Sequence, residues 1–314
     1  MNAANLLAQI VVVALAVAAA PLFMAWVGQC RAWLANRRGP GLLQPYRVLR
    51  KLFHKDAVLA TRASSLFRIA PYVQFGAMAC AAAIIPLLGT DLPFATAADA
   101  IALVGLFAVA RVFLALAAMD IGTAFGSLGA RREMLVGFLA EPALLMVFFT
   151  ASLIAHGTAL PAMATAITGH PLAIYPSLAF AAVAFLMVLL AENARIPVDN
   201  PTTHLELTMI HEAMVLEYSA RHLALIEWSA ALKLFNYCAI GFALFLPWGL
   251  PDRVGSGMLA ALPVVALKFA AAGAGLALLE TVSAKMRIFR APEFLATAFL
   301  LAVLGLLVRL LLGS

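Results

Sequence analysis

Long apolar segments separated by short polar ones make up most of this 314-residue chain. Eight such segments lie near 4–28, 70–89, 98–119, 134–156, 174–193, 224–247, 258–281 and 292–312. A helix of about 20 apolar residues crosses the hydrocarbon core of a bilayer, whereas a strand of a membrane barrel needs only about ten. The pattern therefore predicts an all-α integral membrane protein with about eight transmembrane helices, forming a single polytopic domain over 1–314.

The composition excludes an ordinary soluble fold. Hydrophobic residues make up 65% of the chain, charged residues only 11%, and the mean hydropathy is +1.01. A soluble domain carries roughly 25% charged residues, so this chain would leave far more apolar surface than water tolerates. Lipid removes that difficulty, because the solvent around the bundle is then itself apolar.

The sequence offers no complete metal or catalytic motif. Its three cysteines, Cys30, Cys80 and Cys238, are far apart and form no CxxC pair, which argues against a zinc ribbon or an iron–sulfur cluster held by this chain alone. His211 and Glu212 begin an HExxH pattern, but Val215 stands where the second histidine would be needed. We therefore expect neither a metal site nor catalytic residues, and a membrane hydrolase is a remote alternative.

A basic segment follows the first apolar segment. Residues 31–69 contain nine of the 21 lysines and arginines. After the Gly39–Gly41 turn, a short amphipathic helix on the membrane surface is predicted, with an apolar stripe formed by Leu43, Tyr46, Leu49 and Phe53. The basic residues either signal topology or form a docking surface for a soluble or acidic partner. The candidate docking residues are Arg37, Arg38, Gln44, Arg47, Arg50 and Lys51.

The basic residues also predict the orientation of the chain in the membrane. The odd-numbered connections between the predicted spans carry 16 lysines and arginines, and the even-numbered ones carry only Arg253. Positive connections face the cytoplasm. The odd-numbered connections, including segments 31–69 and 194–223, are therefore predicted to be cytoplasmic, with both termini on the outer face of a bacterial or archaeal inner membrane.

Charged residues also occur inside or at the ends of the predicted spans. They are Arg111, Glu141, Glu192, Glu227, Lys233, Lys268 and Glu280. One such residue alone is typical of a helix end or a structural ion pair, but seven in one bundle favour a polar track that carries ions. The acidic connection 194–223 interleaves acids with apolar residues, so we expect it to fold against the bundle or a partner. We select as ion-path or coupling residues Glu141, Glu192, Arg195, Asp199, Glu206, Glu217, Glu227, Lys233, Lys268 and Glu280.

Several ordered motifs together resemble a known family. They are RRGPGLLQPYRVLRKLF at 37–53, SLFRIAPYV at 65–73, MDIGTAFGSLGARRE at 119–133, LVGFLAEPALL at 135–145, ENARIPVD at 192–199, EYSA at 217–220 and ETVSAKMR at 280–287. They are similar to the membrane anchor subunits of group 4 nickel–iron hydrogenases, represented by formate hydrogenlyase subunit 4 and hydrogenase-4 component C. That group is related to subunit 1 of respiratory complex I.

The resemblance implies a non-catalytic subunit of an oxidoreductase complex. Such a subunit anchors a hydrophilic redox arm and couples its electron transfer to proton or sodium movement. The implied partners are hydrogenase-like large and small subunits, an iron–sulfur subunit, antiporter-like membrane subunits and the lipid bilayer, with no nucleic acid. Iron–sulfur clusters, and a nickel–iron centre if the hydrogenase branch applies, would belong to those partners, and a quinone could bind.

Two features of the acidic connection depart from the family pattern. Thr202 and His204 stand where relatives usually place acids, and the stretch between Leu207 and Glu217 is three residues longer than usual. Both changes affect the region that would couple redox chemistry to ion movement. Two alternatives therefore stay open: a quinone-chamber subunit of a complex I-like oxidoreductase, and a self-contained secondary transporter.

Overall fold

The computed structural model describes residues 3–61, 63–91, 93–94, 98–168, 176–195, 210–251, 256–284, 286 and 290–312. Apart from one isolated bridge between Asp99 and Ala159, the regular structure in these ranges is helical. The helices are α1 (Ala3–Leu34), α2 (Gln44–Phe53), α3 (Ser65–Ile84), α4 (Ala100–Asp120), α5 (Ala124–Ala155), α6 (Leu160–Thr168), α7 (Pro176–Glu192), α9 (His211–Val215), α10 (Ala220–Phe245), α11 (Ser256–Val282) and α12 (Ala291–Leu312).

The predicted all-α membrane fold is confirmed. Seven helices in the described ranges are long and apolar enough to span a membrane, and α7 is a shorter apolar helix that corresponds to the remaining predicted segment. The largest differences are at α3 and α5, which begin earlier than predicted because polar side chains cap them. The Ser64 hydroxyl accepts a hydrogen bond from Leu66 N at the start of α3, and the Thr123 hydroxyl accepts one from Gly126 N at the start of α5.

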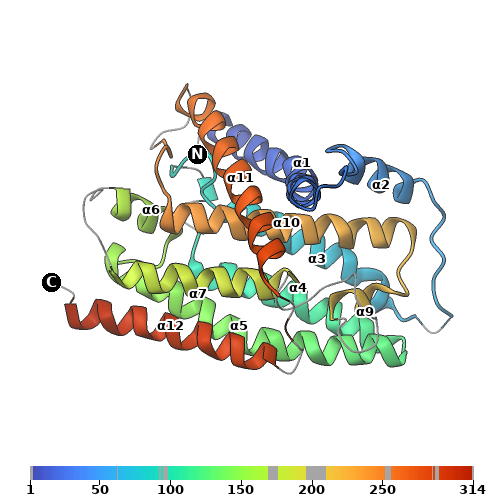
Figure 1. Cartoon of the computed structure of the whole chain (residues 1–314). Coiled ribbons are helices and arrows are strands. Elements are labelled where there is room, and N and C mark those ends of the chain that lie inside the picture. Colours follow the sequence, from blue (N-terminus) through green and yellow to red (C-terminus); the bar gives the residue numbers. More distant parts are fainter. Residues whose placement is uncertain are drawn as a thin grey trace.

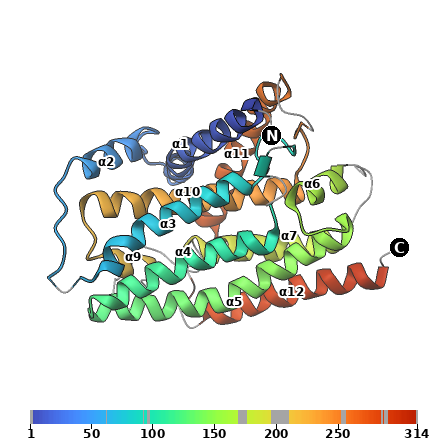
Figure 2. The ribbon, with the colours of Figure 1, turned by 180° about the vertical axis from the view of Figure 1, so that it is seen from behind.

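Helix α10 forms the centre of the bundle (Figures 1 and 2). It packs against α1, α3 and α7, while α12 covers α5 and α7 on the outside. In both views, α2, α9 and the turn between α4 and α5 lie toward one end of the bundle, and the C-terminus lies at the other. The basic connection and the described end of the acidic connection, residues 210–219, therefore lie toward the same end of the bundle.

A proline inside α1 creates a contact with α10. Pro21 has no N–H, so the Val17 carbonyl one turn earlier has no helical donor. The indole Nε1 of Trp228 on α10 donates to that carbonyl at 2.8 Å. The side chain of Trp228 thus replaces the backbone bond that the proline removes. At the neighbouring residue, the Tyr46 hydroxyl of α2 donates to the Ala18 carbonyl.

The same device recurs in α3. Pro71 leaves the Phe67 carbonyl without a helical donor, and the Tyr218 hydroxyl donates to it at 3.0 Å. The rings of Phe67 and Tyr218 also stack, with centroids 3.9 Å apart and planes 6° apart. Tyr218 lies two residues before the start of α10, so this contact fixes the segment between α9 and α10 on α3.

The apolar stripe predicted for α2 is partly wrong. Leu49 and Leu52 are the buried residues of this helix, and they pack with Ala224 of α10. Leu43, by contrast, is 60% exposed and Phe53 is 43% exposed. The stripe is offset because α2 packs against α10 and α1, where the Tyr46 hydroxyl donates to the Ala18 carbonyl.

Candidate functional site

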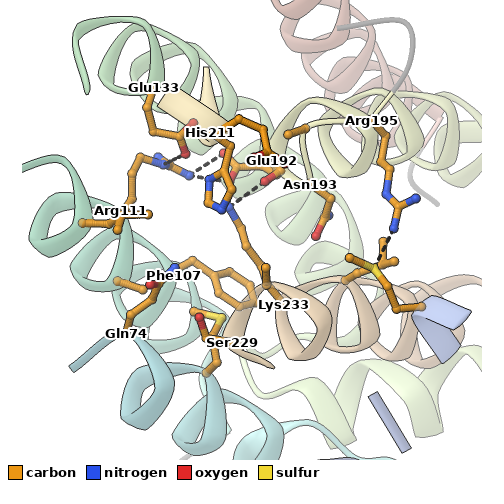
Figure 3. A pocket seen from close by; sticks show the side chains of 18 of the residues that line it. Gln74, Phe107, Arg111, Glu133, Glu192, Asn193, Arg195, His211, Ser229 and Lys233 are labelled. Atoms are coloured by element: carbon orange, nitrogen blue, oxygen red, sulfur yellow. Dashed lines mark hydrogen bonds and ion pairs between the residues drawn. The ribbon is translucent and has the colours of Figure 1, made fainter. Parts of the chain in front are cut away.

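A cavity of about 310 Å³ lies between α1, α3, α4, α5, α7, α10 and α11. Its wall combines apolar side chains such as Met78, Phe107 and Leu114 with charged ones (Figure 3). Its charged lining residues are Arg31, Arg111, Glu133, Glu192, Arg195, Glu212, Lys233 and Glu280. Four of the ten residues chosen from the sequence as coupling residues therefore line one cavity.

Arg111 is the centre of the first charged cluster. It lies near the middle of α4, and its side chain is only 3% exposed. The guanidinium binds Glu192 at the end of α7 and Glu141 on α5, and its Nε lies 3.7 Å from Glu133 Oε1. A buried arginine needs such partners, because an unpaired charge at this depth would cost several kcal/mol.

Glu192 has a second cationic partner, Lys233 of α10. Lys233 Nζ lies 2.9 Å from Glu192 Oε2 and donates to the main-chain carbonyl of the same residue at 2.7 Å. That carbonyl belongs to the last turn of α7, where a cation is favourable. Lys233 therefore caps α7 and neutralises a carboxylate whose side chain is only 1% exposed.

A turn after α7 carries the chain to the second cluster. Arg195 N donates to the Leu190 carbonyl at 2.9 Å, Ala194 N donates to the Ala191 carbonyl at 3.2 Å, and Ala194 has a left-handed φ of 49°. These bonds form a Schellman motif, which ends the helix. The motif places Arg195 beyond the end of α7, on the side of the cavity that faces α1 and α11.

Glu280 of α11 is the carboxylate of this second cluster. Its Oε1 lies 2.9 Å from Arg195 Nη1, and its Oε2 lies 3.3 Å from Arg31 Nη1. The Glu280 side chain is 1% exposed, whereas that of Arg31 is 50% exposed. The second cluster therefore extends from a buried carboxylate to a cation that reaches solvent at the end of α1. Both Arg195 and its partner Glu280 are among the coupling residues selected from the sequence.

The remaining predicted coupling residues lie elsewhere. Glu141 belongs to the Arg111 cluster but does not line the cavity. Glu217 and Glu227 are exposed and do not line the cavity. Lys268 donates to the carbonyls of Leu246 and Trp248, just beyond α10, so it caps that helix. Two further predicted residues, Asp199 and Glu206, lie outside the described residues.

The candidate docking residues Arg37, Arg38, Gln44, Arg47, Arg50 and Lys51 are all exposed. The last four of them belong to α2, which packs against α10 and α1. The candidate docking residues of α2 therefore lie on a helix that is fixed to the bundle.

Sequence reasoning left several polar residues of the site unassigned, among them Arg111, Glu133 and Gln74. Arg111 was recognised as a charge within a span but was not assigned to the coupling path, and Glu133 was read only as part of a motif. The eight-residue spacing of Glu133 and Glu141 on one face of α5 was the available signal. Gln74 is a buried cavity residue whose Oε1 has no hydrogen-bond partner among the described residues, and nothing in the sequence distinguished it.

The fold and the site together define a polytopic membrane protein whose helices enclose a cavity lined by paired charges. The chain matches the family described as NADH dehydrogenase over residues 6–311, and it belongs to that family. This membership confirms the resemblance inferred from the sequence motifs.

Relatives support the same assignment. The chain is 32% identical over 289 residues to formate hydrogenlyase subunit 4 of Escherichia coli (strain K12), covering 92% of this chain and 93% of that protein. It is 36% identical over 230 residues to hydrogenase-4 component C of the same organism, covering 73% and 71%. Its fold is similar to that of a chain in the membrane-bound sulfane sulfur reductase, an archaeal respiratory membrane complex. The TM-score is 0.83 at 21% identity, covering 96% of this chain and 98% of that chain.

Proposed function

We propose that this chain is the membrane anchor and coupling subunit of a multisubunit, hydrogenase-type redox complex. It links electron transfer in a hydrophilic arm to the movement of protons or sodium ions. The observation that carries the proposal is the pair of charged clusters in the bundle, because buried charges at this density are typical of an ion pathway in a membrane protein. The similarity to subunits of formate hydrogenlyase and hydrogenase-4 supports the type of complex.

The two clusters could carry out coupling by exchanging partners. Glu192 is held between Arg111 and Lys233, and Glu280 is held between Arg31 and Arg195. Each carboxylate can gain a proton or a cation only if one of its cationic partners withdraws. A charge change in an arm docked near Arg31 would shift that balance, and the shared cavity would pass it on to Glu192.

The proposed partners are hydrogenase-like large and small subunits, an iron–sulfur subunit and antiporter-like membrane subunits, with the redox cofactors in those chains. The proposed orientation places α2, α9 and the α4–α5 turn on the cytoplasmic side of an inner membrane, with both termini outside. The gathering of these elements at one end of the bundle supports this orientation. The exposed docking surface on and before α2 would then face the arm.

Purification of the full chain in mild detergent, followed by mass spectrometry of the proteins that accompany it, tests the proposal. We expect redox subunits and antiporter-like membrane subunits. A lone chain or a homo-oligomer would refute the proposal and favour a self-contained transporter, which ion flux by the lone chain in liposomes would establish.

The coupling role is tested in the assembled complex with Glu192→Gln. We expect this variant to keep its partners and its electron transfer but to lose ion translocation, because the amide cannot carry the charge that Arg111 and Lys233 bind. Glu293→Gln is the matched control, since Glu293 is an exposed glutamate at the start of α12 that does not line the cavity. Loss of the partners from the Glu192→Gln complex would instead assign Glu192 a structural role.

The cavity favours one alternative, a quinone-chamber subunit of a complex I-like oxidoreductase. At about 310 Å³, with Met78, Phe107 and Leu114 among its lining residues, it has the size and mixed polarity of a small-molecule site. Saturable binding of a short-chain quinone to the purified complex, weakened by substitutions in this wall, would support that alternative.

A further inference from the structure

Three residues of α5 form a polar notch that faces Arg111. Glu133, Gly137 and Glu141 follow one another at intervals of four residues, so they share one face of the helix. Arg111 forms ion pairs with both glutamates of this set, which are separated by about 12 Å of helical rise. Its side chain must therefore lie along α5, directly over the position between them.

Gly137 leaves the space in which that side chain lies. A Cβ atom at this position would be 2.7 Å from both Cδ and Cζ of Arg111, and closer still to Nη1. Side-chain Cβ atoms essentially never approach other heavy atoms within 3.0 Å. The nearest obstacle is thus the guanidinium itself and not the backbone of a neighbouring helix, so a side chain at 137 would displace Arg111 while leaving the helices in place.

The guanidinium has little freedom to move aside. Its side chain is 97% buried, and it contacts carboxylates from two helices, Glu141 on α5 and Glu192 on α7. Glycine is also a poor helix former compared with alanine, yet it occupies the middle of the 32-residue helix α5. By contrast, Gly105 in α4 has no atom within 4 Å of an added Cβ.

We propose that Gly137 is a positioning residue, whose missing side chain allows Arg111 to cross α5 and bind Glu192. With a larger residue at 137, Arg111 leaves Glu192, which then keeps Lys233 as its remaining cationic partner in the described residues. The effect on ion coupling rests on the proposed function, whereas the effect on the position of Arg111 does not.

The thermal unfolding of the full chain in detergent provides the first test. Gly137→Ala should lower the melting temperature by about 5 °C or more, because it disrupts a buried ion-pair cluster. Gly105→Ala is the matched control and should leave the melting temperature unchanged or raise it, since alanine favours the helix. An unchanged or raised melting temperature for Gly137→Ala would overturn the proposal.

A double-mutant cycle shows whether Gly137 acts through Arg111. Arg111→Ala removes the three atoms nearest to the new Cβ, so adding Gly137→Ala to that variant should cause no further loss of stability. An equal loss in both backgrounds would mean that Gly137 packs against something else, and would overturn the proposal. If Arg111→Ala cannot be purified, Arg111→Ser replaces it, because serine also lacks the Cδ, Cζ and Nη1 atoms.

The cycle also gives an answer if Gly137→Ala alone does not fold. The double variant Arg111→Ala/Gly137→Ala should then be purified in the same yield as Arg111→Ala alone. If Arg111→Ala can be purified and the double variant cannot, the proposal is overturned. In the assembled complex, Gly137→Ala should shift the pH profile of ion translocation in the same direction as Arg111→Lys. If the effects of Gly137→Ala and Arg111→Ala on stability are coupled but Gly137→Ala leaves ion translocation unchanged, the positioning role is upheld and the proposed function is contradicted.

Discussion

The Tyr218 hydroxyl supplies the hydrogen bond that Pro71 removes from α3, and this role can be measured. Tyr218 is 5% exposed and Phe67 is fully buried, so the Phe67 carbonyl has no access to water. Burial raises the pKa of Tyr218 well above its usual value, and the phenol therefore remains a neutral donor at any ordinary pH. Replacing it with phenylalanine keeps the stacked rings and removes only the donor.

The expected cost follows from this geometry. A buried carbonyl left without a donor costs about 1–3 kcal/mol, and hydrogen bonds in membrane proteins average nearer 0.6 kcal/mol. We therefore expect Tyr218→Phe to lose about 1–2 kcal/mol, which is a fall of roughly 2–6 °C in melting temperature for a chain of this size. Tyr72→Phe is the control, because Tyr72 lies on α3 near Pro71 and is about half exposed.

The assay is thermal unfolding of the purified protein in two backgrounds. In a Pro71→Ala background, the new N–H can donate to the Phe67 carbonyl within the helix. Tyr218→Phe should then cost close to nothing. If Tyr218→Phe costs the same in both backgrounds, the hydroxyl does not compensate for the proline and the reasoning is refuted.

Two further substitutions probe the second cluster and the docking surface. Glu280→Gln should destabilise the protein less than Glu192→Gln, because Arg31 is half exposed and can be hydrated when its carboxylate is lost; a larger loss of melting temperature than for Glu192→Gln would contradict this. Reversing charge with Arg50→Glu and Lys51→Glu should release soluble partners during purification while leaving the melting temperature within about 1 °C, because both side chains are exposed. Retention of every partner at physiological salt would contradict docking through α2.

The spans were predictable because their signal is local. An apolar run of sufficient length predicts a membrane helix whatever its neighbours are, and each of the eight predicted segments corresponds to a helix. The starts of α3 and α5 were placed too late, since Ser64 and Thr123 cap helices whose first turns are partly polar. Helix α6 was missed because a helix of nine residues is too short to cross a bilayer.

The sequence identified several residues of the site, but it did not predict which of them pair with one another. Charged residues in apolar spans are conspicuous, so Glu192, Lys233 and Glu280 could be selected from the sequence alone. Their pairing depends on which helix faces meet, and the sequence does not encode that locally. The same limit explains Lys268, which looked like its neighbours in the sequence but caps the end of α10.

The order of synthesis gives the Arg111 cluster a consequence for insertion into the membrane. Arg111 is made before Glu133 and Glu141, and Glu192 follows 81 residues after it. An arginine at the centre of a lone membrane helix costs about 2.5–3.5 kcal/mol during insertion. Helix α5 carries two carboxylates to Arg111 and follows α4 after a short turn. We therefore expect α4 and α5 to enter the bilayer together as a hairpin in which Arg111 is already paired with Glu133 and Glu141. Helix α7 would then pack against this hairpin and bring Glu192 to Arg111.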